Sequence, residues 1–265
     1  MYRKHFGLTQ HPFAKEIAPE ELFVSQAGRE LEVRLGHLLE LRGIGLVTGE
    51  VGSGKTTLCR KVTASLHSGL YRVVYVSLTT GNVTDLYKST AWELGLPTER
   101  SLAALFRCIR AEVTRLTLES RMRLVLIVDE AHHLRSDVLE NLRLLTNYEM
   151  DSHSRLCLLL VGQAELRRRL SMAVHEAFSQ RIVIRHHMLG LTREELPLYL
   201  AHLLHRAGTE LPLFEPAATE ALFQATSGLP RKVNLLAHHA LTAAALSKSR
   251  TVCAAHVEAA LPEVS

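Results

Sequence analysis

Residues 49–56 read GEVGSGKT and match the pattern G-x-x-x-x-G-K-[ST]. The apolar run Ile44–Thr48 precedes them, and a helical pattern begins at Lys55. Glycines between a strand and a helix let backbone N–H groups turn inward around phosphate oxygens, and the helix N-terminus adds a partial positive charge. The pattern and its context together predict a phosphate-binding loop rather than a chance glycine-rich turn.

Short apolar runs recur along the chain and alternate with helical patterns. The predicted strands cover residues 44–48, 71–77, 124–128, 156–161 and 181–184. The predicted helices cover residues 26–41, 55 onward, 83–94, 102–119 and 138–148, with helical turns up to residue 178. Alternation of buried strands with helices is typical of a parallel sheet that is covered on both faces. We therefore predict the α/β class, with a five-stranded parallel sheet flanked by helices.

The pattern changes after residue 190. Helical segments follow over residues 191–207, 216–226, 230–247 and 254–261, and they predict a small all-helical domain. At the other end, residues 1–25 carry prolines and scattered aromatic residues without a period, which indicates an ordered strap. The expected organisation is a strap over residues 1–25, an α/β nucleotide-binding domain over 26–190 and a helical lid domain over 191–265.

The composition is that of a globular protein, because 47% of the 265 residues are hydrophobic. The apolar runs are far shorter than the roughly 20 residues that span a bilayer, and none follows the basic start as a signal peptide requires. We expect a cytoplasmic protein with no membrane insertion. The four cysteines lie far apart and are interpreted as buried small residues. Adjacent histidines such as His132-His133 should point to different faces, so no metal site is predicted from them.

Two carboxylates, Asp129 and Glu130, follow the apolar run Leu124–Val128. The carboxyl ends of parallel strands form the ligand-binding edge of an open α/β sheet, so both should lie beside the phosphate loop. Alone, such a pair could equally be a solvated helix N-cap, but the upstream loop favours the functional interpretation. The continuation Ala131-His132 spells the box of one helicase class. Those helicases need two tandem motor domains, and this chain has one phosphate loop.

The loop and the two carboxylates predict binding of ATP with Mg²⁺. Lys55 would neutralise the β- and γ-phosphates, and Thr56 would place its hydroxyl on Mg²⁺. Asp129 would hold the ion through water, and Glu130 would orient and deprotonate the water that attacks the γ-phosphate. We therefore expect an Mg²⁺-dependent ATPase that releases ADP and phosphate.

Several stretches of the chain resemble one family. His5-Phe6-Gly7-Leu8 with Pro12-Phe13 is similar to its N-terminal motif, Gly49–Thr57 to its Walker A loop, and Leu124–Glu130 with Ala131-His132 to its Walker B segment. From end to end, the chain resembles the AAA+ ATPases, in the ExeA-like branch that includes the TniB-like and TnsC-like ATPases of transposons. The resemblance implies a P-loop NTPase sheet ordered 5-1-4-3-2, with ATP between it and the lid. The implied nucleotide contacts are Gly49, Glu50, Val51, Gly52, Ser53, Gly54, Lys55, Thr56, Thr57 and Arg231.

Three catalytic roles are implied by the resemblance alone. Gln163 stands where the family has sensor 1, which implies that it positions the attacking water, although it could be an ordinary loop glutamine. Arg181 follows a run similar to the arginine-finger region, which implies contact with a neighbouring subunit's γ-phosphate; it could equally be a surface arginine. Arg231 resembles sensor 2, which contacts the nucleotide of its own chain, although Gly228-Leu229-Pro230-Arg231 also describes a good helix start.

The fold does not determine the cellular role of the ATPase, and two roles remain open. In the first, a homo-oligomeric ring or filament assembles on duplex DNA and recruits or activates a transposase, as the transposon relatives do. In the second, the chain assists secretion-apparatus assembly, as ExeA does. Relatives of the second kind add a membrane span and a wall-binding domain, and the sequence as given ends at Ser265 with neither, so we expect the DNA role. A small signalling ATPase is a third alternative.

If DNA is the partner, its contacts should be sequence-nonspecific ones between basic residues and phosphates. Lys and Arg together exceed Asp and Glu by only 31 to 27, so charge alone decides nothing. The candidates are Lys88, Arg107, Arg110 and Arg115, which lie in the region that faces DNA in related ring or filament ATPases. From the residues alone, the three arginines are more often the solvated side of an amphipathic helix.

Overall fold

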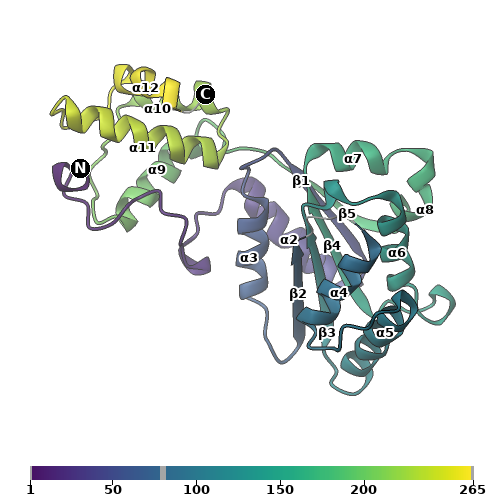
Figure 1. Ribbon diagram of the computed structural model, residues 1–265. Helices are drawn as coiled ribbons and strands as arrows, with labels where there is room; N and C mark the ends of the chain where they lie inside the picture. Colours follow the sequence, from purple (N-terminus) through teal and green to yellow (C-terminus); the bar gives the residue numbers. More distant parts are fainter. Residues whose placement is uncertain (1, 78–81, 264–265) are drawn as a thin grey trace. The chain divides into compact units, whose positions relative to one another are not determined.

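The computed structural model describes residues 2–77 and 82–263. Its contacts divide the chain into two compact units, and each is described by itself (Figure 1). The α/β unit contains Gly28–Val51 and Lys55–Met188. The helical unit contains Met1–Ala27, Gly52–Gly54 and Leu189–Ser265. In the described part of the chain, no helix combines the length and the apolar character that a membrane crossing needs.

The α/β unit is built on a five-stranded sheet in which every strand pairs in parallel. Its strands are β1 (Ile44–Gly49), β2 (Tyr71–Ser77), β3 (Arg123–Asp129), β4 (Leu156–Gly162) and β5 (Ile182–Met188). They lie in the order β2-β3-β4-β1-β5, so the predicted fold class and strand order 5-1-4-3-2 are confirmed. The pairing of Ser77 with Asp129 and of Thr48 with Gly162 aligns the carboxyl ends of neighbouring strands along one edge.

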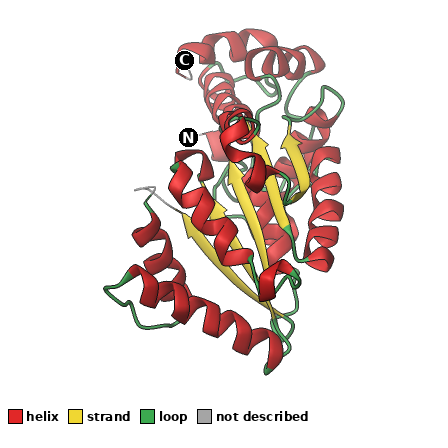
Figure 2. Cartoon of the chain, turned by 90° about the vertical axis from the view of Figure 1, so that its right-hand side faces the viewer, coloured by secondary structure: helices red, strands yellow, loops and turns green. Residues whose placement is uncertain are grey.

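Helices cover both faces of this sheet (Figure 2). They are α2 (Gln26–Leu41), α3 (Lys55–Ala64), α4 (Val83–Glu93), α5 (Leu102–Leu118), α6 (Ser136–Thr146), α7 (Ala164–Leu170) and α8 (Glu176–Ser179), with short 3-10 turns η2 (Ala131–His133), η3 (Glu149–Asp151) and η4 (Ala173–His175). In β3, Leu124, Leu126 and Val128 pack into the core that includes α4, α5 and α6, whereas Val125 and Ile127 pack toward α2 and α3. Burial on both faces explains why this strand is a continuous apolar run.

Two predictions were wrong in detail. Strand β5 runs to Met188, four residues beyond the predicted end, because β5 is an edge strand with alternating burial, and Arg185 and His187 lie on its more exposed face. The predicted burial of all four cysteines holds only for Cys59 and Cys157; the other two are half-buried, and all are free thiols.

The helical unit contains α9 (Glu195–Arg206), α10 (Pro216–Thr226), α11 (Pro230–Leu246) and α12 (Ala254–Ala260), together with α1 (Tyr2–His5), η1 (Pro19–Glu21) and η5 (Leu261–Glu263). Helix α9 starts at Glu195 rather than at the predicted residue 191, because the Thr192 hydroxyl accepts from the Glu195 N–H and the Glu195 carboxylate accepts from the Thr192 N–H.

The first 27 residues are part of the helical unit. Tyr2, Phe6 and Leu8 are buried in its core, and the Tyr2 hydroxyl lies 3.1 Å from His238 Nδ1 on α11. Farther along, Arg206 on α9 pairs with the Glu21 carboxylate at 3.0 Å. Both ends of the N-terminal segment are thus held by side chains of the C-terminal helices.

Candidate nucleotide-binding site

The loop between β1 and α3 depends on glycine at two positions. Gly52 and Gly54 have φ values of +81° and +92°, in the region that other residues adopt only with strain. Within the helical unit, the Arg231 N–H donates to the Gly52 carbonyl at 3.2 Å. A Cβ atom on Gly52 would lie 2.6 Å from the Cβ of Arg231, so this position also has no room for a side chain.

Polar groups of the loop are oriented for an anion. The Lys55 ammonium donates to the carbonyls of Gly49 at 2.9 Å and Glu50 at 2.8 Å, which holds it over the loop. The Ser53 hydroxyl is buried and has no hydrogen-bond partner among the described residues, which is costly unless a ligand satisfies it. Each of these two side chains is a donor of the kind that phosphate oxygens accept from.

Three donors hold the buried carboxylate of Asp129 at the end of β3. The Thr56 hydroxyl donates to Oδ2 at 2.7 Å, the Tyr75 hydroxyl donates to the same oxygen at 2.8 Å, and the Glu130 N–H donates to Oδ1 at 2.8 Å. Hydroxyl and carboxylate oxygens are ligands that Mg²⁺ prefers, so Thr56 and Asp129 fit the predicted metal role. The structure brings these two residues into direct contact across 73 positions of sequence.

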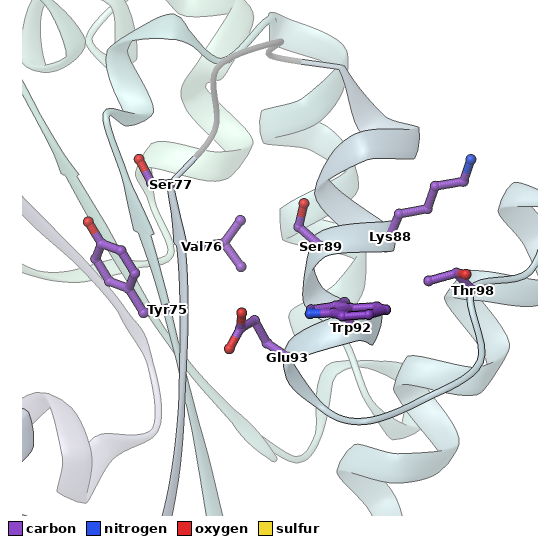
Figure 3. Close-up of a pocket in the computed structure, with 8 residues that line it drawn as sticks. All are labelled: Tyr75, Val76, Ser77, Lys88, Ser89, Trp92, Glu93 and Thr98. Carbon is purple, nitrogen blue, oxygen red and sulfur yellow. The ribbon is translucent and has the colours of Figure 1, made fainter.

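Tyr75 is a member of this group that the sequence did not reveal. Burial, followed by the hydrogen bond to Asp129, raises the pKa of its phenol, so the hydroxyl keeps its proton and donates. Tyr75 and Val76 leave β2 in opposite directions (Figure 3), and the alternation places Tyr75 on the face toward Asp129. The register of β2 against β3 was the missing information, because only the pairing of Ser77 with Asp129 puts Tyr75 within reach.

Glu130 occupies a strained position directly after the strand. Its φ of 53° and ψ of 31° lie in the left-handed region, which costs about 1–2 kcal/mol for a residue with a side chain. Half of its side chain, 51%, is exposed. Non-glycine residues with such backbone angles cluster at functional sites. The side chain of Glu130 is thus half exposed, whereas that of the preceding Asp129 is buried.

His132 lies between Glu130 and Gln163. Its Nδ1 lies 3.5 Å from the Glu130 carboxylate and accepts from the Gln163 N–H at 3.4 Å, and its Nε2 lies 2.8 Å from the Gln163 side-chain amide. Burial, and then the neighbouring His133, lowers the pKa of the His132 ring, so it is neutral at pH 7. Arg169 fixes the turn by donating to the carbonyl of His132 at 3.0 Å. In the sequence, His132 stood out in the discounted helicase box and beside the Walker B resemblance, and neither gave it a role of its own.

The expectation that His132 and His133 diverge was wrong. Their ring centroids are 4.0 Å apart, because the 3-10 turn η2 replaces the regular helix or strand that the expectation assumed. Ligand atoms of Glu130, His132 and His133 lie within 4.8 Å of one another. Both ring nitrogens of His132 already face Gln163, so this group serves better as a positioning network than as a metal site.

The other predicted site residues lie outside the group around Asp129 and Glu130. Arg181 is half-buried at the start of β5, and Arg231 is exposed in the first turn of α11. Of the proposed DNA contacts, Lys88 is exposed beside a pocket of about 380 Å³ between β2 and α4, where Trp92 also lies (Figure 3), and Arg107 is exposed on α5. Arg110 lies 4.1 Å from the centre of the Tyr148 ring, and Arg115 pairs with Glu112 at 2.7 Å.

Comparison with known proteins agrees with this geometry. A family model described as "AAA domain" matches residues 38–170. The chain is 35% identical over 268 aligned positions to the "General secretion pathway protein A" of Aeromonas hydrophila; the match covers all of this chain and 49% of that protein. The chain thus spans about half the length of this curated relative.

Solved structures share the fold. The Aeropyrum pernix ORC2 protein superposes with a TM-score of 0.69 and 20% identity, over 96% of this chain and 71% of that one. The ORC1 protein of the same organism, solved in complex with DNA, gives 0.66 and 20% identity, over 99% and 69%. The loop between β1 and α3, the carboxylates after β3, the strand order and the match over half of the sequence lead to one conclusion: the chain belongs to the AAA domain family.

Proposed function

We propose that this chain binds ATP with Mg²⁺ on residues 49–56, hydrolyses it, and uses the cycle to assist a secretion apparatus. The observation that supports the secretion role is the 35% identity, across the whole chain, to a general secretion pathway protein A. The ATPase activity is supported by the contact of Thr56 with Asp129 beside the glycine-rich loop.

In this proposal, each residue of the site has a task. Lys55 binds the β- and γ-phosphate oxygens, and Thr56 and Asp129 hold Mg²⁺, which when bound offsets the charge of the phosphates. Glu130 accepts the proton of the attacking water, and Gln163 orients that water. Neutral His132 accepts from the Gln163 N–H and contacts its side-chain amide, and so orients Gln163 beside Glu130.

Two arginines extend the proposal to an assembly. Arg231, whose backbone contacts the loop at Gly52, would sense the nucleotide of its own chain. Arg181 would reach the nucleotide of a neighbouring copy, which requires a homo-oligomer. The Arg181→Ala variant tests this role: it should keep nucleotide binding but lose turnover. Mixing it with Lys55→Ala protein, which still has Arg181, should restore part of the activity. Absence of any restoration would leave Arg181 a surface residue.

The transposition role expected from the sequence is the less supported of the two. The curated relative is a secretion protein, and the likeness to a DNA-bound ORC1 protein at 20% identity concerns the fold alone. Arg110 packs on the Tyr148 ring and the exposed Arg115 pairs with Glu112, whereas Lys88 and Arg107 are also exposed. ATP-dependent assembly on duplex DNA remains a useful test of the alternative, since it should weaken steeply with salt.

The proposal is tested with Lys55→Ala and Glu130→Gln. Lys55→Ala should lose nucleotide binding, whereas Glu130→Gln should bind ATP normally, stop turnover and accumulate an ATP-bound oligomer. In the host cell, the wild-type gene but not the Glu130→Gln gene should restore secretion to a deletion strain. Equal loss of binding in both variants would refute the division of roles, and normal secretion in the deletion strain would refute the secretion role.

A further inference from the structure

A second pocket of the α/β unit lies at the amino ends of its strands. It has a volume of about 340 Å³ and is formed where α2 ends, where β2 begins and where α5 passes into β3. Its lining includes Arg42, Arg121, Arg123, Leu70, Tyr71 and Met122. The phosphate loop and Asp129 follow the opposite ends of β1 and β3, about 20 Å away for strands of this length. The two sites are therefore separate.

The charge of this pocket is one-sided. Three arginines line it and no carboxylate does. Arg123 donates to the Leu39 carbonyl at 3.3 Å and lies 6.0 Å from the centre of the Tyr71 ring. Within residues 2–77 and 82–263, the guanidinium groups of Arg42 and Arg121 make no hydrogen bond or ion pair. Like charges in one pocket repel each other, and a bound anion would relieve that repulsion.

The backbone at the two unpaired arginines is strained. Arg42 has a φ of 52° in the turn directly after α2, and Arg121 has a φ of 53° in the loop between α5 and β3. Glycine adopts this left-handed conformation without steric cost and is the usual residue at such turns. Instead, the chain has an arginine at both positions, and both line the same pocket. Backbone strain of this kind is found most often at ligand sites.

The walls of the pocket are preformed. The Arg123 N–H donates to the Leu70 carbonyl at 2.8 Å, and the Met122 N–H donates to the Leu116 carbonyl at 2.8 Å. These bonds tie the start of β2 and the end of α5 to β3. Between the arginines lie apolar side chains, of which Leu70 is 55% exposed. A ligand would thus meet donors of charge-assisted hydrogen bonds and an apolar surface together.

We propose that this pocket binds a small molecule with a phosphate monoester group and an apolar or aromatic part. The planar guanidinium group of arginine pairs with phosphate oxygens through two parallel hydrogen bonds. The guanidinium N–H groups of Arg42 and Arg121 are available for such bonds. Leu70, Tyr71 and Met122 supply the surface for the organic part. The proposal does not depend on the ATPase function, because the pocket shares no residue with the loop or with Asp129.

Phenyl phosphate is a suitable probe, titrated in phosphate-free buffer at fixed ionic strength and followed by NMR or calorimetry. The Lys55→Ala protein is used, and a parallel titration is done on wild-type protein saturated with Mg²⁺–ADP, so that binding at residues 49–56 does not interfere. Phenyl phosphate should bind more tightly than inorganic phosphate, and phenol should not bind. No binding of phenyl phosphate at about 10 mM, or equal binding of phenol, would overturn the proposal.

The decisive variant is Arg42→Gly with Arg121→Gly, because glycine suits both turns while it removes both guanidinium groups. We expect at least tenfold weaker binding together with a Tm higher by about 4–8 °C, so that loss of binding is not loss of fold. The matched control, Arg100→Ala with Arg107→Ala, removes the same charge from exposed positions outside the pocket and should change neither. Unchanged binding in the glycine variant would assign any binding to another site.

Discussion

The two ends of the central sheet differ in whether their charged side chains have hydrogen-bond partners. At the carboxyl end, the buried Asp129 carboxylate receives hydrogen bonds from Thr56, Tyr75 and its own neighbour's N–H. At the amino end, the guanidinium groups of Arg42 and Arg121 make no hydrogen bond or ion pair within the described residues. A buried charge must be satisfied inside the protein, whereas an accessible one can be left for solvent or a ligand. The site around Asp129 is therefore already hydrogen-bonded within the protein, whereas the arginine pocket has donors that a bound anion could use.

The largest expected effect is at the carboxyl end. Asp129→Ala removes a proposed Mg²⁺ contact and leaves the Thr56 and Tyr75 hydroxyls without their common acceptor. Turnover should fall by about 10²–10³-fold, since a bound metal ion contributes several kcal/mol to such reactions. Steady-state ATPase assays across Mg²⁺ concentrations measure it. A loss below tenfold would mean that the satisfied carboxylate is structural and not part of the metal site.

A smaller effect is expected at His132. Its pKa is lowered below the ordinary 6.5, so the ring is neutral at pH 7 and gains a proton only as the pH falls through that lowered value. The unfolded chain takes up its proton at higher pH, so the stability that the neutral ring contributes is present above pH 6.5 and is lost below it. Protonation also removes the acceptor for the Gln163 N–H, so turnover should fall with it.

The variant that tests this pH dependence is His132→Gln, which cannot take up a proton. It should lose roughly tenfold in kcat, as partners that orient active groups commonly do, and its pH–rate profile should lack the acidic decline of the wild type. Nucleotide affinity serves as the control and should be unchanged. An identical acidic decline in the variant would assign it to another group.

Two tyrosines near opposite ends of β2 provide a matched pair of variants. Tyr75→Phe removes the hydroxyl that holds Asp129, whereas Tyr71→Phe removes one beside the arginine pocket, four residues earlier on the same face of the strand. Tyr75→Phe should raise the Mg²⁺ concentration needed for nucleotide binding about three- to tenfold, which corresponds to about 0.7–1.4 kcal/mol. Tyr71→Phe should leave it unchanged. A fluorescent nucleotide titrated at several Mg²⁺ concentrations distinguishes them.

The smallest effect concerns the amino end alone. Arg42→Gly should raise the free energy of unfolding by about 1 kcal/mol, because glycine removes the cost of a left-handed backbone. Denaturant titration measures the change. The single substitution Arg107→Ala, at an exposed helical position, is the control and should stay within about 0.5 kcal/mol. A stability decrease in Arg42→Gly would show that the guanidinium makes contacts that stabilise the fold.

The regular elements were predictable because burial leaves a local mark on the sequence. The apolar runs at 44–48, 124–128 and 156–161 correspond to the three inner strands, each buried on both faces. Strand β5 ended later than predicted because an edge strand tolerates arginine and histidine on its exposed side. Helix α9 began later than predicted because a reciprocal pair of hydrogen bonds at Thr192 and Glu195 starts it.

The sequence by itself determined the phosphate loop, the acidic pair after the third strand and the class of the fold, because each is written within a few neighbouring residues. Tertiary structure alone decided which distant side chains complete them. Tyr75 reaches Asp129 through strand register, His132 reaches Gln163 through the turn that follows Glu130, and two separate segments bring Arg42 together with Arg121 and Arg123 in one pocket. Contacts of this kind depend on pairing and packing over long separations, which no local pattern encodes.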